Sequence, residues 1–336
     1  MKKTYLAAGA VTGAVGATIA WKLLSRPKEI IWKEHARLVK HSDRSHFVSV
    51  DGHRAHFQEF GDPNGPVLLL IHGFTASTYV WKTVAPALGE QGFRVIAIDL
   101  LGFGYSEKPA AFDYTIEAQA RFVLRFMNRL GLGRVTLVGS SYGGAVSMTI
   151  ALDYPERVEK LVLVDAVIND EAKEHPVMKL AAIRGVGEVI TPFFLDSRRF
   201  MKVRMRNTLA PANHHLITED RISSILRPLS AADGHHSVLA SGRNWSATRL
   251  ENDAHLINQP TLIIWGEHDT VIRIENGYKL YDKILNSRFV ILKDCGHVPQ
   301  EEKSDIFTDL VTEFVRDRKG RIEERDGDEV RLEKAS

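Results

Sequence analysis

The sequence predicts an α/β fold with a mostly parallel central sheet, helices on both of its faces and a helical cap inserted late in the chain. Short, fully apolar runs alternate with segments of helical periodicity, which is typical of parallel strands buried on both faces. A β-hairpin signal precedes the first of these runs. Between Asp165 and Pro260 the alternation stops for about 85 residues, which is far too long for a loop in a compact domain.

The predicted strands are short apolar runs. The hairpin pairs 47–50 with 55–60 around Asp51-Gly52, a strong turn signal. The later strands cover 67–71, 95–100, 135–138, 161–164, 262–265 and 289–292. Helical periodicity is found between most of them, over 77–89, 115–130, 142–154, 274–285 and 303–316. Strands that are spaced by helices in this way pair in parallel.

We therefore divide the chain into an amino-terminal segment, a core, a cap and a tail. Residues 1–28 are the apolar amino-terminal segment, and residues 29–167 together with 254–316 form the α/β core. Residues 168–253 form the helical cap. Residues 317–336 are densely charged, so we expect a solvated or disordered tail. Because open α/β sheets bind ligands at the carboxyl ends of their strands, the cap should lie over the ligand site.

The composition narrows the possible functions. The 336 residues carry a formal net charge of +2, which gives no bulk reason to expect a nucleic-acid partner. Cys295 is the only cysteine, so the chain can form neither an intrachain disulfide nor a cysteine-based zinc site. We expect neither a cofactor nor a metal.

The amino-terminal segment is almost continuously apolar or small from Thr4 to Leu24, and Lys22 lies where it could snorkel to a membrane interface. A helix over 4–24 would span roughly 31 Å, about the hydrocarbon thickness of a bilayer. Its small residues include a GxxxG pair, which favours helix packing in lipid. A retained membrane anchor, a cleaved signal peptide that leaves a secreted or periplasmic protein, and an ordinary soluble helix all remain open.

The clearest chemical motif is Gly-Ser-Ser-Tyr-Gly at 139–143, which matches G-x-S-x-G. It follows the predicted strand 135–138 and opens the predicted helix 142–154. A strand that turns into a helix at once leaves the central serine on a strained corner, and glycines on both sides remove side chains that would collide there. The free N–H groups of the new helix point toward the reaction site. Ser141 is therefore the predicted nucleophile.

A serine hydroxyl needs a base, and the base needs a carboxylate that orients it. His297 is the predicted base because it follows the last strand and precedes the last helix. Asp269 follows the strand 262–265 and is the predicted acid. Asp165 ends the strand before the cap, so it is an alternative acid or a capping residue.

The oxyanion that forms during acyl transfer needs preorganised N–H donors. The predicted donors are the backbone amides of Tyr142, next to the nucleophile, and Phe74, in the loop that follows the strand 67–71. His72 is predicted to brace this loop. Asp99 and Ser106 are interpreted as loop-stabilising residues, because the glycines near them lack the third position of a dinucleotide fingerprint.

In combination these motifs resemble those of the capped α/β-hydrolase family. The resemblance covers roughly residues 45–316 and rests on five segments. They are His-Gly-Phe at 72–74, Asp-x-x-Gly-Phe-Gly-x-Ser at 99–106, the motif at 139–143, Gly-Glu-His-Asp at 266–269 and Cys-Gly-His at 295–297. The resemblance implies the α/β-hydrolase fold and a triad in the chain order Ser141, Asp269, His297.

Within the family, the chain most resembles bacterial esterases and lipases and the membrane-anchored monoacylglycerol-lipase branch. Epoxide hydrolases and haloalkane dehalogenases share the scaffold but carry aspartate as the nucleophile. Ser141 therefore argues against both of those activities.

The predicted cap contains one basic, amphipathic segment. Its basic residues and its apolar residues each recur every four positions. They are Arg198, Lys202 and Arg206 on one side, and Met201, Met205 and Leu209 on the other. One interpretation is a lid that places its basic face near anionic lipid headgroups and its apolar face over an acyl pocket. The other is a cap helix that packs its apolar side on the domain.

The sequence favours hydrolysis of a carboxylic ester, with a small-molecule ester or a lipid as substrate and an apolar acyl group. One alternative is a carbon–carbon hydrolase that acts on ring-cleavage products with the same triad. The other is a ligand-binding protein on a hydrolase fold, against which the intact Ser141, His297 and Asp269 weigh.

Overall fold

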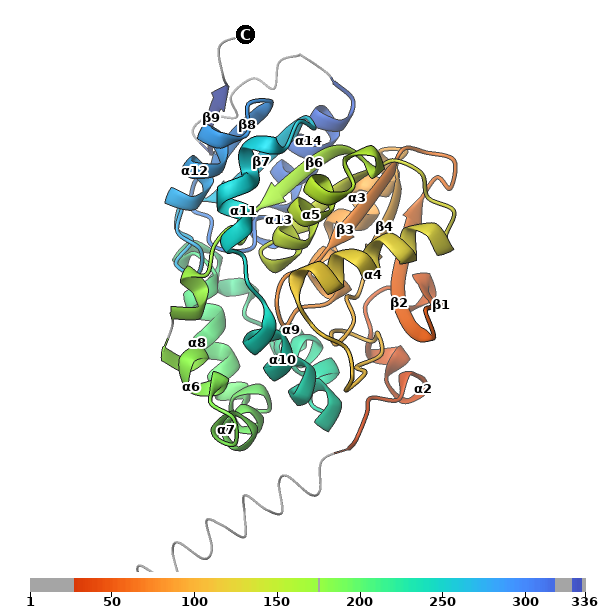
Figure 1. Ribbon diagram of the computed structural model, residues 1–336, viewed down its shortest axis with the longest axis vertical. Helices are drawn as coiled ribbons and strands as arrows, with labels where there is room; N and C mark the ends of the chain where they lie inside the picture. Colours follow the sequence, from red (N-terminus) through yellow and green to blue (C-terminus); the bar gives the residue numbers. More distant parts are fainter. Residues whose placement is uncertain (1–26, 175, 318–327, 334–336) are drawn as a thin grey trace, which may run out of the picture.

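A computed structural model of the chain describes residues 27–174, 176–317 and 328–333. Over these residues the strands form one sheet in the order β1-β2-β4-β3-β5-β6-β7-β8-β9 (Figure 1). The strands are β1 Ser45–Val50, β2 His53–Gly61, β3 Val67–Ile71, β4 Arg94–Ile98, β5 Val135–Ser140, β6 Val158–Val164, β7 Thr261–Gly266, β8 Ser287–Leu292 and β9 Glu329–Glu333. The strands from β4 to β8 in this order pair in parallel, and the predicted hairpin adds two antiparallel strands at one edge.

Helices cover both faces of the sheet, because successive strand residues point to opposite faces and both sides of the strands are apolar. One buried cluster joins the sheet to α4 Ile116–Arg129, α5 Tyr142–Asp153 and α12 Glu275–Lys283. A second cluster joins the other face to α3 Val84–Glu90 and α14 Ser304–Val315. In β3, Leu69 and Ile71 belong to the first cluster, and Leu68 and Leu70 belong to the second. The predicted fold class is confirmed.

The helices inserted between β6 and β7 lie beside the sheet, at the end where the loops after its parallel strands gather (Figure 1). They are α6 Pro176–Ala182, α7 Val186–Leu195, α8 Arg198–Thr208, α9 Glu219–Leu226, α10 Ala232–Asn244 and α11 Thr248–Asp253. An inserted helical region is therefore present where the sequence predicts it. The limits 168–253 for this cap stay a prediction.

The basic segment of the cap forms α8. Its buried Met201 and Met205 pack against α9 in a small apolar cluster. Arg198 and Lys202 both pair with Glu219 at the start of α9, at 3.0 and 2.6 Å. Met201 and Met205 of α8 thus pack within the cap, against α9.

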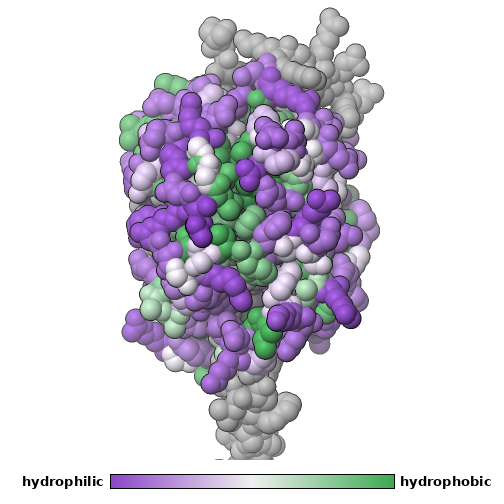
Figure 2. Space-filling model, turned by 90° about the vertical axis from the view of Figure 1, so that its right-hand side faces the viewer, coloured by the Kyte–Doolittle hydropathy of each residue, from purple (hydrophilic) through white to green (hydrophobic). Residues whose placement is uncertain are grey.

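The described chain begins on the cap, where the carbonyl of Pro27 accepts a hydrogen bond from the amide of Ala232 at the start of α10. The predicted anchor or signal segment at 4–24 lies outside the described residues. Within the part of the chain that is described, no helix combines the length and the apolar character needed to cross a membrane. The face in Figure 2 is largely hydrophilic, with a narrow band of hydrophobic side chains near its middle.

The prediction of a solvated or disordered tail over 317–336 is wrong for part of that range. Glu329–Glu333 forms β9, which pairs antiparallel with β8. Val330 and Leu332 alternate with charged residues, and Leu332 packs against the main core cluster. A two-residue period of this kind suits a strand with one buried face, but the high charge of the surrounding segment conceals it.

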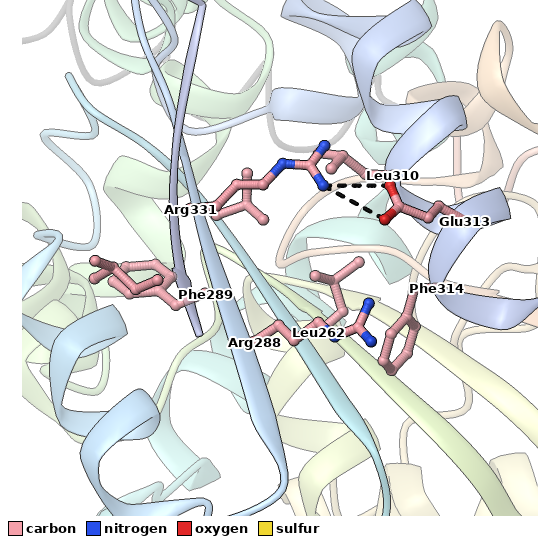
Figure 3. Close-up of a pocket in the computed structure, with 9 residues that line it drawn as sticks. Leu262, Arg288, Phe289, Leu310, Glu313, Phe314 and Arg331 are labelled. Carbon is pink, nitrogen blue, oxygen red and sulfur yellow. Dashed lines mark hydrogen bonds and ion pairs between the residues drawn. The ribbon is translucent and has the colours of Figure 1, made fainter. Parts of the chain in front are cut away.

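A small crevice lies between β8, β9 and α14 (Figure 3). Arg331 of β9 reaches across it to the carboxylate of Glu313 in α14, at 3.3 Å. Leu262 and Arg288, which also line the crevice, are second residues of β7 and β8. The crevice therefore lies toward the starts of these strands, away from the ends where the predicted catalytic residues are found.

Candidate active site

Ser141 lies at the turn between β5 and α5, with φ at 53° and ψ at −117°. A positive φ is strained for a serine and is kept only where the surrounding structure enforces it. A Cβ on Gly139 would lie 2.4 Å from the carbonyl oxygen of Gly143, and a Cβ on Gly143 would lie 2.1 Å from that of Ile71. Only glycine fits at both positions, and the tight turn leaves the side chain of Ser141 half-buried at the end of the strand.

The three predicted catalytic side chains meet although they come from loops after three different strands. His297 Nε2 lies 3.0 Å from Ser141 Oγ, and His297 Nδ1 lies 2.7 Å from Asp269 Oδ2. The other oxygen of Asp269 accepts hydrogen bonds from the amides of Val271 and Ile272, at 2.7 and 3.0 Å. These two amides fix the orientation of the carboxylate that faces the histidine.

Asp165, the alternative acid, lies beside this group without replacing Asp269. Its Oδ1 accepts a hydrogen bond from the amide of Gly266 at 2.9 Å, and its side chain is fully buried. No hydrogen bond joins it to His297 among the described residues. Burial, and then the charge of Asp269, raise the pKa of Asp165 well above its usual range. Asp165 therefore binds the loop backbone, whereas Asp269 directly contacts the base.

Asp165, Asp269 and His297 also form the one group of metal-ligand type in the described part of the chain, with one donor atom of each within 4.8 Å of the others. The hydrogen bond between Asp269 and His297 already accounts for much of this proximity. A Ser-His-Asp arrangement transfers acyl groups without a metal. The expectation that the protein uses no metal or cofactor stays a prediction.

The two predicted oxyanion donors belong to two segments that meet at the nucleophile. Tyr142 begins α5 directly after Ser141, and Phe74 belongs to the turn after β3. Gly73 lies so close that a Cβ on it would be 3.1 Å from Ser141 Cβ. Within the described residues, neither the Phe74 amide nor the Tyr142 amide donates a hydrogen bond. Both N–H groups therefore remain free to bind a developing oxyanion.

Comparison with known proteins fits this arrangement. The family described as alpha/beta hydrolase fold matches residues 66–304 of the chain. The chain belongs to this family.

Relatives of this hydrolase align with most of the chain. The uncharacterised hydrolase YugF of Bacillus subtilis is 28% identical over 271 residues, which cover 80% of this chain and 96% of that protein. A 2-hydroxymuconate semialdehyde hydrolase from a Pseudomonas species is 28% identical over 259 residues, which cover 74% of this chain and 86% of that protein.

Two solved structures extend the comparison. A serine hydrolase involved in carbazole degradation is 25% identical, with a TM-score of 0.66, over 82% of this chain and 99% of its own. A membrane phospholipase A is 24% identical, with a TM-score of 0.68, over 95% of this chain and 100% of its own. At 24% identity the second likeness shows the fold alone.

In this α/β hydrolase the loop that carries Phe74 is braced by His72, as predicted. His72 is fully buried, and its Nε2 accepts a hydrogen bond from the amide of Leu100 at 3.1 Å. Its Nδ1 lies 2.8 Å from the carbonyl oxygen of Gly73 and must therefore carry the proton. Burial lowers the pKa of His72, although the nearby charge of Asp99 opposes the shift. The ring is thus held neutral.

Asp99 organises the same region. Its two carboxylate oxygens accept hydrogen bonds from the amides of Thr78 and Tyr105, at 2.6 and 2.8 Å, and Oδ2 lies 2.6 Å from His56 Nδ1. The hydroxyl of Ser106 donates to the carbonyl of Asp99 at 2.6 Å. Burial alone would raise the pKa of Asp99, but the charge of His56 and its hydrogen bond outweigh burial and lower it. These contacts confirm the loop-stabilising interpretation.

Sequence reasoning missed Glu302, which ties the loop of His297 to the cap. Its carboxylate accepts hydrogen bonds from the amides of Gly296 and Ala210, at 3.0 and 2.8 Å, and from the side-chain amide of Asn213 at 2.9 Å. In the sequence Glu302 looks like an ordinary acidic residue near a helix start. Its role depends on contacts with a segment about 90 positions away, which no local pattern reveals.

An aromatic cluster adjoins the oxyanion loop. The ring centroid of Phe74 lies 5.7 Å from Phe103, 6.1 Å from Tyr142 and 5.7 Å from Trp245 of the cap. Tyr142 and Trp245 stack with their centroids 5.3 Å apart. The surroundings of the oxyanion donors are therefore largely apolar.

Proposed function

We propose that this α/β hydrolase cleaves carboxylic esters with an apolar acyl group through an acyl-enzyme intermediate on Ser141. The observation that carries the proposal is the continuous contact from Asp269 Oδ2 through His297 to Ser141 Oγ, at 2.7 and 3.0 Å. Both distances lie within reach of a hydrogen bond along which a proton can move.

The reaction follows from these contacts. His297 Nε2 accepts the proton of Ser141 as Oγ attacks the ester carbonyl, and Asp269 stabilises the imidazolium that forms. The amides of Phe74 and Tyr142 receive the oxyanion. His297 then gives the proton to the leaving alcohol. In the second half-reaction it activates a water, which cleaves the acyl–Ser141 bond and releases the acid.

The aromatic cluster supports an apolar acyl group. Phe74, whose amide is a proposed oxyanion donor, presents its ring to Phe103 and Trp245. Apolar surfaces beside the reacting carbonyl favour hydrocarbon chains, since burial of apolar area stabilises binding by roughly 25 cal/mol per Å².

Cleavage of a carbon–carbon bond in a ring-cleavage product is the second candidate. The support comes from the relatives named 2-hydroxymuconate semialdehyde hydrolase and 2-hydroxy-6-oxo-2,4-heptadienoate hydrolase, at 28% and 29% identity. If the protein catalyses this reaction, it should turn over a ring-cleavage dienoate faster than any simple ester. A non-catalytic role is opposed by the intact hydrogen bonds among Ser141, His297 and Asp269.

We also propose that residues 4–24 attach the protein to a membrane. One support is the apolar length of this segment. The other is that Pro27, with which the described chain begins, contacts the cap. In fractionation of cells that express the full chain, the protein should stay with membranes after carbonate washing. A soluble protein with its mature amino terminus beyond residue 20 would indicate a cleaved signal peptide instead.

The central test uses neighbouring serines as a matched pair. Ser141→Ala should abolish both hydrolysis of p-nitrophenyl butanoate and labelling by a fluorophosphonate. Ser140→Ala should keep both, because the Ser140 hydroxyl is buried and contacts Gln300. Labelling that persists in Ser141→Ala would refute the proposed nucleophile. Parallel rates with a ring-cleavage dienoate decide between the two candidate reactions.

A further inference from the structure

We propose that Arg204, on the cap helix α8, binds an anionic group of the substrate, so that preferred esters carry a carboxylate or a phosphate in addition to the bond that is cleaved. This inference rests on the proposed ester hydrolysis and deepens it, because it names a chemical class of substrate.

The position of α8 places Arg204 close to the catalytic loops. The carbonyl of Thr208, near the end of α8, accepts a hydrogen bond from the amide of His297 at 2.8 Å. The carbonyl of Asn207 accepts another from the hydroxyl of Thr270, next to Asp269, at 2.6 Å. The last turn of α8 is therefore bound to the loops that carry both the base and the acid.

Arg204 lies one helical turn before Thr208, on the same side of α8. Its Nη2 donates a hydrogen bond to Oγ1 of Thr75 at 2.7 Å. Thr75 directly follows Phe74, a proposed oxyanion donor. The guanidinium thus contacts the loop of the oxyanion donors from a helix whose last turn is bound to the loops of the base and the acid.

Arg204 is partly buried and lacks the carboxylate partner that two other arginines of the cap have. Arg198 pairs with Glu219 at 3.0 Å, and Arg221 pairs with Glu301 at 2.9 Å. Among the described residues, no carboxylate forms an ion pair with Arg204, and its bond to Thr75 is the one hydrogen bond of its guanidinium. Burial lowers the pKa of Arg204, yet a guanidinium stays protonated in proteins.

Arg204 is partly buried, and a cation that is partly withdrawn from water without a counter-charge is costly to maintain. Such a charge is retained where a partner arrives from outside, and a planar guanidinium suits the paired oxygens of a carboxylate or phosphate. The alternative role is that Arg204 only fastens the cap to the oxyanion loop through Thr75. The two roles differ in one respect: a fastening contact affects all substrates alike, whereas an anion site affects charged substrates selectively.

The experiment compares charged and neutral esters of equal size. Mono-p-nitrophenyl glutarate and p-nitrophenyl pentanoate differ by a carboxylate on the acyl side. The butanoate esters of p-hydroxybenzoate and of p-hydroxyphenyl phosphate place a carboxylate or a phosphate on the alcohol side, and the butanoate ester of methyl p-hydroxybenzoate is their neutral counterpart. The ester whose kcat/KM depends on Arg204 shows whether the bound anion is a carboxylate or a phosphate, and whether it belongs to the acyl or the alcohol part of the substrate.

Arg204→Met should lower kcat/KM for the matching charged ester by about 10- to 100-fold, the usual effect of losing a hydrogen bond to a charged group. The neutral counterpart should change less than about threefold, within the scatter of a surface substitution. Arg204→Lys should recover part of the lost activity, and Arg206→Met, at an exposed position of the same helix, is the matched control. Equal losses for charged and neutral esters, or no loss for any charged ester, would overturn the inference.

A binding measurement separates this inference from the proposed function. Calorimetric titration of the same charged esters into Ser141→Ala, with and without Arg204→Met, requires no turnover. If the wild-type protein hydrolyses none of the esters but binding still depends on Arg204, the proposed reaction fails and the anion site stands. If binding does not depend on Arg204, the anion site fails whatever the rates are.

Discussion

Two buried histidine–aspartate contacts in this protein have nearly the same geometry and different surroundings. His297 Nδ1 lies 2.7 Å from Asp269, and His56 Nδ1 lies 2.6 Å from Asp99. The second ring nitrogen makes the difference. Nε2 of His297 reaches the half-buried Ser141, whereas Nε2 of His56 is buried without a hydrogen-bond partner among the described residues. A histidine–carboxylate pair is thus poised for catalysis only where its far nitrogen meets a reactive group.

The carboxylates of Asp269 and Asp99 also differ in what they contact. Asp269 uses one oxygen for the base and the other for two loop amides. Asp99 uses both oxygens for loop amides and shares one of them with His56. We therefore expect substitutions at the first pair to reduce activity and substitutions at the second to reduce stability.

The largest expected effect is a loss of activity at the pair of His297 and Asp269. Asp269→Asn should lower kcat for p-nitrophenyl butanoate by about 10⁴-fold, as the same change does in a serine protease, because the histidine loses its orienting charge. The unfolding midpoint in urea should change little. Asp165→Asn is the control, and a larger loss there than at Asp269 would show that the wrong acid has been assigned.

Asp99→Ala should act on stability instead. Removal of one partner from a buried charged pair costs about 3–5 kcal/mol of unfolding free energy, which urea denaturation would measure. The fraction that stays folded should still react with a fluorophosphonate. Asp113→Ala, at an exposed position, should cost less than about 0.5 kcal/mol. An Asp99→Ala protein that is stable but does not react would place Asp99 in the chemistry.

Ser106→Ala should also lower the free energy of unfolding, but by less than Asp99→Ala. The hydroxyl donates to the carbonyl of Asp99 and accepts from the amide of His56, at 2.6 and 2.9 Å. Its loss leaves a buried amide without an acceptor, which costs about 1–2 kcal/mol of unfolding free energy. A loss as large as that of Asp99→Ala would mean that the hydroxyl, rather than the carboxylate, holds this region together.

The smallest effect is a pH dependence that comes from His72. Because the folded protein lowers the pKa of His72, its contribution to stability is complete above the unfolded value, about pH 6.5, and is lost as the pH falls toward the folded value. The stability advantage of the wild-type protein over His72→Gln should therefore shrink between about pH 7 and pH 5. The exposed His255→Gln serves as the control. A difference in unfolding free energy between the wild-type protein and His72→Gln that stays constant with pH would contradict this role of His72.

The sequence predicted the sheet apart from β9, the inserted helices, and the loops that carry Ser141, Asp269 and His297, because their signals are local. Apolar runs mark the strands, and the motif at 139–143 needs only five adjacent residues. The predicted helix 77–89 is instead a short 3-10 turn, Thr78–Trp81, followed by α3. The amide of Thr78 is drawn to the carboxylate of Asp99, a tertiary contact that no periodicity contains.

Glu302 and Arg204 were missed for a related reason. Each looks like an ordinary charged surface residue in its own segment, and each acquires its significance from a segment far away in the chain. Of the three basic residues that the sequence analysis singled out in α8, Arg198 and Lys202 both pair with Glu219. Arg204, which breaks their four-residue spacing, is the one that faces the catalytic loops.

The carboxy-terminal strand β9 has a consequence for how the molecule behaves in a crowded solution. Without it, β8 would present an open edge beside Phe289 and Ile291, and open apolar edges recruit strands from other chains into aggregates. The backbone of β9 pairs with this edge and Leu332 packs against the core, while the charges of Glu329 and Arg331 make β9 itself a poor template for a further strand. A highly charged stretch of sequence thus protects the sheet from self-association.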